Sequence, residues 1–167
     1  LAQDYTNAGT YLKQAIEIWE KTNSSNDPVL AAAYSNLAEN YRTQKRFAEA
    51  EPLIRKAREI WARGYGPDHP DVATADYNLG EMFMDQGKLA GAEQLIRRAL
   101  AEGESKFGAG HRVVINTIYG LARVLHAAGR LTEAERLYKR TIASREKELG
   151  NEHIGVAVAQ RDLADLY

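Results

Sequence analysis

The sequence predicts an all-α fold, a right-handed solenoid of eight helices arranged largely as antiparallel pairs. The first observation is a leucine that recurs 42 residues apart, at positions 37, 79, 121 and 163. A small residue follows each leucine, and a bulky residue comes three positions later. The second observation is that the apolar residues between these anchors recur at helical spacing. A fixed period of this length is typical of stacked structural repeats.

The first segment of the chain, residues 1–22, is predicted to hold one helix from about residue 4 to residue 22. Residues 23–27 form a polar break, in which Asp27 is suited to cap the next helix and Pro28 to begin it. The apolar residues of this first helix recur three and four positions apart, which places them on one face: Ala8, Tyr11, Leu12, Ala15, Ile18 and Trp19.

Three helix pairs and a last single helix are predicted to follow. In the first pair, a short polar turn at residues 44–46 separates two apolar helical patterns, so the two helices must run antiparallel. Glycines occupy the corresponding turns of the next two pairs, and the last helix is expected to run to Tyr167. We therefore expect one array over residues 1–167, composed of a half-unit at 1–22, units at 28–64, 70–106 and 112–149, and a half-unit at 154–167.

The second helix of each pair has small residues in a register of its own. Short side chains allow two helices to approach to the roughly 8–10 Å of close packing. A single pair would leave an apolar face in water, so neighbouring pairs are expected to stack. The recurring residues are Ala8, Ala50, Ala92 and Ala134, and then Ala15, Ala57 and Ala99, with Thr141 in the last copy.

This pattern resembles the tetratricopeptide repeat, in the 42-residue variety of kinesin light chains and many bacterial proteins. The resemblance covers essentially the whole chain. It implies a superhelix that serves as a protein-interaction scaffold, in which the first helix of each unit lines a concave surface. The residues that match the repeat are Leu37, Ala38, Tyr41, Ala50, Ile54 and Ala57, with their equivalents in the later copies.

A candidate peptide-binding groove follows from this resemblance. Helical geometry agrees with it, because the implied lining positions form a stripe beside the core stripe. The alternative, in which the stripe is only the polar side of a stable stack, remains open. The candidate residues are Asn36, Arg42, Tyr77, Asn78, Glu81, Asn116, Tyr119, Arg123, His126 and Arg161, with Ser35, Glu39, Met84, Asp162 and Asp165 beside them.

Composition and motifs give no support for catalysis, a cofactor or a metal site. The chain has no cysteine, and no phosphate-binding loop or nucleophile–base spacing is present. His69, His111 and His153 share one linker position, but one repeat separates them, which is too far for a common metal ion. We expect each of them to cap a helix. Trp19 and Trp61 share a helical register and are expected to pack between neighbouring units.

We therefore expect a non-enzymatic scaffold that binds a protein or peptide partner. The alternative is a structural, regulatory or self-association arm of a larger protein, associating through the exposed C-terminal helix. The formal net charge of −1 gives no reason to expect nucleic-acid or membrane binding. No signal peptide or bilayer-length apolar run is visible, and we expect a cytoplasmic location. The start at Leu1, in the middle of the pattern, suggests a piece of a longer protein.

Overall fold

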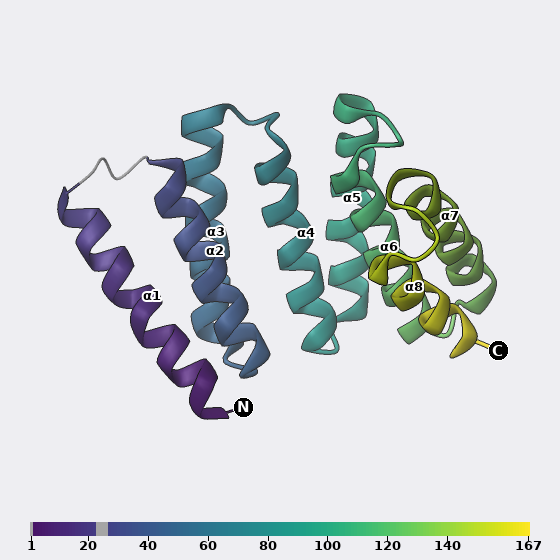
Figure 1. Cartoon of the computed structure of the whole chain (residues 1–167), viewed down its shortest axis with the longest axis horizontal. Coiled ribbons are helices and arrows are strands. Elements are labelled where there is room, and N and C mark those ends of the chain that lie inside the picture. The colour runs from purple at the N-terminus through teal and green to yellow at the C-terminus, as the bar shows by residue number, and fades with distance from the viewer. Residues whose placement is uncertain (1, 23–26) are drawn as a thin grey trace. The chain divides into compact units, whose positions relative to one another are not determined.

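The computed structural model describes residues 2–22 and 27–167, and side chains from Tyr5 onward (Figure 1). Helices and turns alone make up the described residues. Leu1 and the predicted polar break at residues 23–26 lie outside them. The helices are α1 (Ala2–Thr22), α2 (Pro28–Thr43), α3 (Phe47–Tyr65), α4 (Pro70–Asp85), α5 (Leu89–Phe107), α6 (Arg112–Ala127), α7 (Leu131–Leu149) and α8 (Ile154–Ala164).

The chain folds as two compact units, residues 1–86 and 87–167, and each is described by itself. In the first unit, α2 packs against α1 and most extensively against α3, which also contacts α4. In the second unit, α6 packs against α5 and most extensively against α7, which also contacts α8. The predicted division into three units between two half-units remains a prediction.

Four helices begin with a side-chain cap at the same place in the repeat. The Asp27 carboxylate accepts a hydrogen bond from the backbone N–H of Val29 at 2.9 Å. In the later copies a histidine Nδ1 accepts from the N–H two residues on, at 3.3 Å for His69 and His111 and 3.0 Å for His153. These bonds satisfy N–H groups that a helix start leaves without a partner. The predicted capping role of the histidines is confirmed.

The turn after α2 and the turn after α6 are built in the same way. Arg46 N–H donates to the Tyr41 carbonyl and Lys45 N–H to the Arg42 carbonyl, at 2.9 and 2.8 Å. Residues 129 and 130 make the equivalent bonds at 2.9 Å. This pattern needs a left-handed residue, which is usually glycine. Gly129 supplies it with φ 74°, whereas the equivalent residue in the first turn is Lys45, with φ 60°.

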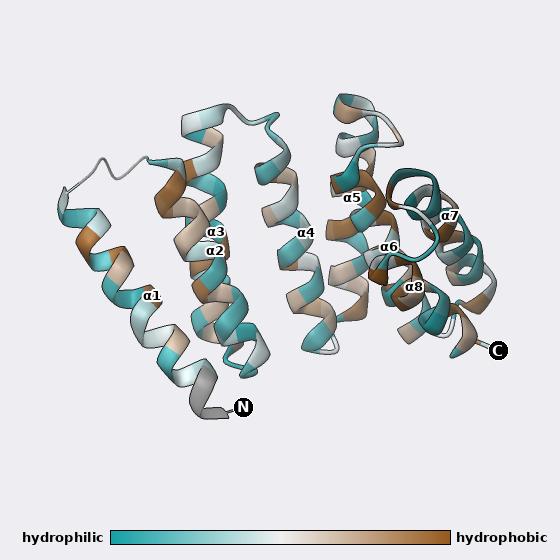
Figure 2. Cartoon of the chain, in the orientation of Figure 1, coloured by the Kyte–Doolittle hydropathy of each residue, from teal (hydrophilic) through white to brown (hydrophobic). Residues whose placement is uncertain are grey.

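The predicted core residues are buried wherever a neighbouring helix covers them. The anchors Leu37, Leu79 and Leu121 are 4%, 3% and 1% exposed, and Ala57 on the second helix is fully buried. Each helix carries both hydrophobic and hydrophilic residues, as Figure 2 shows by colour. One-sided burial of this kind is expected when every helix has a packed side and a solvent side.

The apolar face of α1, the half-unit at the start of the predicted array, is exposed. Tyr11 and Ile18 are 71% and 61% exposed. Ala8 and Ala15 are also exposed, although their equivalents on α3, α5 and α7 are buried. Instead, α1 packs on α2 through the other side of the helix, where Gly9 and Ile16 are buried. No helix of the described unit covers the apolar face of α1, so residues that match the repeat pattern are exposed to solvent there.

The last helix is shorter than predicted. It ends at Ala164, and the N–H groups of Leu166 and Tyr167 bond to carbonyls three residues back, which is a tighter turn than the α-helix makes. Leu163 and Leu166 are half-buried rather than exposed, while Tyr167 is 80% exposed. Its hydroxyl donates to Glu135 of α7 at 2.7 Å.

Ion pairs connect successive second helices within each unit. In the first unit, the Lys56 ammonium of α3 lies 3.0 Å from the Glu20 carboxylate of α1. In the second unit, Arg140 of α7 lies 2.6 Å from Glu104 of α5. Glu104 lies two repeat periods after Glu20, and Arg140 lies two repeat periods after Lys56. The two ion pairs therefore occupy equivalent positions in the repeat.

Replacing Lys45 with glycine should stabilise the chain. A side chain at a left-handed residue costs roughly 1–2 kcal/mol, part of which the greater freedom of glycine in the unfolded chain cancels. We expect Lys45→Gly to raise the free energy of unfolding by about 0.5–1 kcal/mol in urea titrations. Gly129→Ala is the matched reverse change and should lower it. A Lys45→Gly variant less stable than the parent chain would contradict this account of the turn.

Candidate functional site

The predicted groove residues of the first unit lie on α2 and α4, and we call them the α2–α4 patch: Asn36, Arg42, Tyr77, Asn78 and Glu81. Asn36 is exposed, and Tyr77 and Asn78 are half-buried. Glu81 is only 6% exposed, which makes it the least accessible member of the patch. The position beside the core stripe therefore does not guarantee a solvent-facing side chain.

Arg42 is held by carboxylates of its own unit. Its guanidinium donates to both oxygens of Glu39, at 2.7 and 2.8 Å, and also to Asp85 of α4. The Glu39 hydrogen bonds, and the charges of Glu39, Asp85 and Glu81, raise the pKa of Arg42 above its ordinary value. A bidentate pair is strong and directional. Arg42 therefore stabilises the contact of α2 with α4, and its charge is already balanced before any ligand arrives.

Asn36 and Asn78 occupy the same position of the repeat on α2 and α4. Neither amide makes a hydrogen bond to any residue in the described part of the chain. Each carboxamide offers two donors and an acceptor, which matches the needs of an extended peptide backbone. Asn36 also borders an apolar cleft of about 280 Å³ between α1 and α2, lined by Leu12, Ala15, Trp19, Val29, Ala32 and Ala33.

In the second unit, the predicted residues lie on α6 and α8, and we call them the α6–α8 patch: Asn116, Tyr119, Arg123, His126 and Arg161. Its centre is Tyr119, whose hydroxyl donates to Asp162 at 2.5 Å. Arg161 also pairs with Asp162, at 2.7 Å. Burial, together with the hydrogen bond to Asp162, raises the pKa of Tyr119 to about 12. Tyr119 thus joins α6 to α8 within the unit.

Arg145 of α7 belongs to this patch, although the sequence pattern did not point to it. Its guanidinium lies 4.6 Å from the centre of the Tyr119 ring, at cation–π distance. It also donates to the Asn116 side chain at 3.2 Å and to the Gly155 carbonyl at 2.7 Å. Trp19 and Trp61 precede Arg145 in the same register of the repeat. A charged residue in a tryptophan register is the signal that could have identified it.

The other members of the α6–α8 patch are less constrained. Arg123 lies 5.9 Å from the centre of the Tyr119 ring. The half-buried His126 meets the edge of the Tyr138 ring, with the ring centres 6.2 Å apart. Arg161 is exposed. The patch therefore presents a rigid aromatic centre with cationic groups around it, and the carboxylates of Asp162 and Asp165 partly neutralise them.

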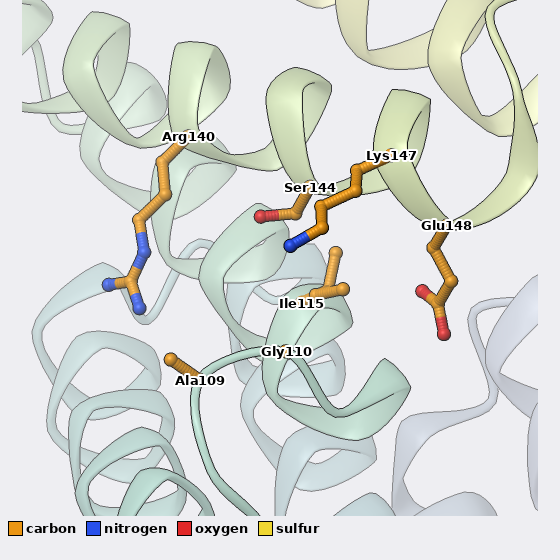
Figure 3. Close-up of a pocket in the computed structure, with 7 residues that line it drawn as sticks. All are labelled: Ala109, Gly110, Ile115, Arg140, Ser144, Lys147 and Glu148. Atoms are coloured by element: carbon orange, nitrogen blue, oxygen red, sulfur yellow. The ribbon is translucent and has the colours of Figure 1, made fainter.

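A separate cleft of about 430 Å³ opens in the second unit between the α5–α6 loop and α7. Figure 3 shows Arg140 and Lys147 extending from α7 on either side of Ser144, with Ile115 below them. Glu148 projects away from these two cations. Ala109 and Gly110 of the loop complete the lining. The sequence pattern did not single out any of these cleft residues as a site.

Within the residues that the structure describes, no three histidine, aspartate or glutamate side chains gather in an arrangement that could hold a metal ion. Trp61 is 7% exposed, as expected for a side chain that packs between neighbouring repeats. Trp19 is half-buried, and its indole N–H donates to the Asp27 carboxylate at 3.1 Å. None of the described helices combines the length and apolar character needed to span a membrane.

The tetratricopeptide repeat model matches residues 1–57, 29–101, 71–147 and 113–167. No curated protein matches the chain. Among solved structures, the chain is similar to a kinesin-light-chain-like protein of Podosopora anserina with nearly identical TPR-like repeats. The two are 26% identical with a TM-score of 0.71, over 99% of this chain and 80% of that one.

Two further structures share the fold at lower identity. BtubC (BKLC) from P. vanneervenii is 22% identical with a TM-score of 0.77, and the match covers 98% of this chain and 65% of that one. A Rap protein complexed with Competence and Sporulation Factor is 17% identical with a TM-score of 0.82, over 99% of this chain and 44% of that one. The family match and these structures confirm the predicted all-α solenoid of helix pairs and its kinesin-light-chain-like character.

We expect Tyr119 to make the free energy of unfolding depend on pH in the alkaline range. Its pKa rises from an ordinary value of 10.0 to about 12 in the folded chain. Between these values the unfolded chain has lost the phenol proton while the folded chain keeps it, so the free energy of unfolding should fall as pH rises. Urea titrations across this range should show a shallower fall for Tyr119→Phe than for the parent chain.

Tyr34 needs a parallel measurement, because burial and its hydrogen bond to Glu20 also raise its pKa. Tyr34→Phe should remove a separate part of the slope. An ultraviolet titration of tyrosinate formation gives an independent readout, in which Tyr119→Phe should lose a late-titrating component. If the late component survives in Tyr119→Phe, the assignment to Tyr119 is wrong.

Proposed function

The chain belongs to the tetratricopeptide repeat family, and from this premise we propose that it binds a peptide segment of a partner protein on the first helices of its units. Non-enzymatic protein–protein interaction scaffolds are typical of the family, and the match to the family model extends along the chain. The structurally similar Rap protein is complexed with Competence and Sporulation Factor. Beyond the scaffold role that is typical of the family, we infer that the partner binds on the first helix of each helix pair.

The observation that carries this proposal is the repeated asparagine of the α2–α4 patch. Asn36 and Asn78 lie at equivalent positions, and their amides make no hydrogen bonds inside the described chain. A repeated amide is suited to a ligand whose own backbone repeats, since each carboxamide can hydrogen-bond one peptide group. The cleft beside Asn36 offers apolar surface for a neighbouring side chain of the ligand.

The charges around each patch predict the ligand's composition. In the first unit, Glu39, Glu81 and Asp85 surround a single guanidinium, so this patch favours a neutral or basic segment. In the second unit, Arg123, Arg145 and Arg161 outnumber the carboxylates of Asp162 and Asp165, so that patch tolerates acidic side chains. We propose that each patch takes a segment whose charge matches its own surroundings, and that the protein acts in the cytoplasm.

The amides can be tested without disturbing the fold. We expect the double variant Asn36→Ala/Asn78→Ala to weaken binding of a peptide selected on the parent chain by at least about 2 kcal/mol, if the pair acts as a hot spot. Isothermal titration calorimetry would measure the affinity, and circular dichroism the thermal midpoint, which should change little. Asn7→Ala on α1 is the matched control, since Asn7 is an exposed helical amide outside the patch. Unchanged affinity in the double variant would exclude the α2–α4 patch as the binding surface.

A second candidate function is self-association, and the burial of equivalent residues favours it. On α2, which packs most extensively against α3, Ala38 and Tyr41 are 1% and 6% exposed. Their equivalents on α8, Ala164 and Tyr167, are exposed. On α1, Ala15 is exposed, whereas its equivalent on α3, Ala57, is fully buried. The α8 of one copy and the α1 of another therefore present the two matching faces of one helix pair.

Complementation would test this head-to-tail contact. Ala15→Arg should block the α1 face and Ala164→Arg the α8 face, so each variant alone should lose association beyond the monomer in analytical ultracentrifugation. An equimolar mixture should form a dimer, because each variant keeps the face that the other lacks. A parent chain that stays monomeric at high concentration excludes the contact. Association that survives in Ala15→Arg but not in Ala164→Arg would instead indicate a symmetric contact through α8.

A further inference from the structure

The cleft beside α7 differs from the proposed peptide surface in both its residues and its chemistry. It lies between the α5–α6 loop and the C-terminal half of α7, and none of its lining residues belongs to either patch. Two cations and a hydroxyl line one wall, the backbone of Ala109 and Gly110 lines the other, and Ile115 forms an apolar floor (Figure 3).

The register position of Ser144 varies along the chain: it holds Ile18 on α1, Ile60 on α3 and the exposed Glu102 on α5. Ser144 follows Ile60 by two repeat periods. Ile60 is 4% exposed and belongs to the core of the first unit, whereas Ser144 is only half-buried. The larger Ile115 in the register of Ala31 restores part of the lost volume, yet a cleft remains. The cleft therefore lies at a position that only one copy of the repeat, Ile60, fills with a buried side chain, so a polar residue can stand there without loss of the core.

The polar groups of this wall are not used inside the fold. The Ser144 hydroxyl makes no hydrogen bond, and the Lys147 ammonium makes no ion pair, with any residue that the structure describes. Arg140 bonds to Glu104 at 2.6 Å through one terminal nitrogen, and its remaining N–H groups make no other contact of this kind. Glu148 projects away from both cations. The unused groups of this wall are therefore the Ser144 hydroxyl, the Lys147 ammonium and the N–H groups of Arg140 that do not bond to Glu104.

We propose that this cleft is an oxyanion-binding site, which takes the phosphoryl group or carboxylate of an acidic or phosphorylated side chain on a bound protein. Lys147 and Arg140 supply charge-assisted hydrogen bonds from two sides, and Ser144 donates a third between them. The apolar floor at Ile115 accommodates the carbon stem that carries the anion. The site does not depend on the proposed peptide surface, so each can fail without the other.

Titration with inorganic phosphate tests the site directly. Nuclear magnetic resonance of the full chain should show saturable shifts of the Gly110 and Ser144 backbone amides. Lys147→Ala and Ser144→Val should each weaken the phosphate affinity, by about tenfold for the lost charge. Arg136→Ala is the matched control, because it removes an exposed cation from the same helix outside the cleft. Equal affinity in Lys147→Ala and Arg136→Ala would mean that phosphate responds to net charge alone, and would overturn the site.

A variant that is expected to bind phosphate more tightly distinguishes a local effect from weaker binding caused by unfolding. Glu104→Gln removes the carboxylate that competes for Arg140 and should strengthen phosphate binding severalfold. Glu102→Gln, an exposed change on the same helix with the same charge difference, should leave the affinity unchanged. If both glutamate variants bind phosphate equally well, Arg140 does not contribute to a local site and the proposal is wrong.

The source of the anion follows from a paired comparison. A short peptide with phosphoserine and the same peptide with glutamate are titrated against the parent chain and against Lys147→Ala. Tighter binding of the phosphopeptide, lost in Lys147→Ala, assigns a phosphorylated partner. Equal binding of both peptides, again lost in Lys147→Ala, assigns an acidic one. Binding of neither peptide, or no difference between the parent chain and Lys147→Ala, overturns the proposal.

Discussion

The close crossing of helices at alanine is the contact on which each unit of this chain depends. Ala38 on α2 and Ala50 and Ala57 on α3 are at most 1% exposed, and Ala122 and Ala134 are fully buried in the second unit. Short side chains at the crossing allow two backbones to pack closely, and larger neighbours such as Ile54 and Tyr138 fill the space on either side. Small side chains therefore recur at these positions, with Gly80 in the place of Ala38 in the next copy. Thr141, in the place of Ala57, is also fully buried, and its hydroxyl donates to the Leu137 carbonyl at 2.9 Å.

This constraint explains why the fold was predictable from the sequence. The anchor leucines, the alanines and the capping histidines repeat because each copy meets the same neighbours, and repetition makes them visible without coordinates. The exposure on α1 has the same origin, since Ala15 follows the pattern of Ala57 but has no covering helix in its unit. Periodicity reveals which residues are suited to burial, whereas actual burial depends on what lies next to them.

The candidate site was less predictable, because its charges are paired across helices. Arg42 was expected to face a ligand, yet its carboxylate partner Asp85 comes from another helix, 43 residues later in the chain. Tyr119 is likewise held by Asp162. The register did predict the positions of Asn36 and Asn78, whose amides remain available. Arg145 and Ser144 escaped notice because they lie on a second helix, where the repeat predicts core residues.

The ion pairs between second helices also bear on how a repetitive chain avoids folding errors. Repeats that share a core pattern can stack with the wrong neighbour while they fold, and each wrong pairing buries similar apolar surface. Exposed ion pairs add little to stability, but they can distinguish correct from incorrect partners. Glu20 and Glu104 have an alanine, Ala62, at the equivalent position of the copy between them. A stack shifted by one copy would place Lys56 or Arg140 opposite a side chain other than its glutamate. These surface charges can therefore favour the correct pairing of helices during folding.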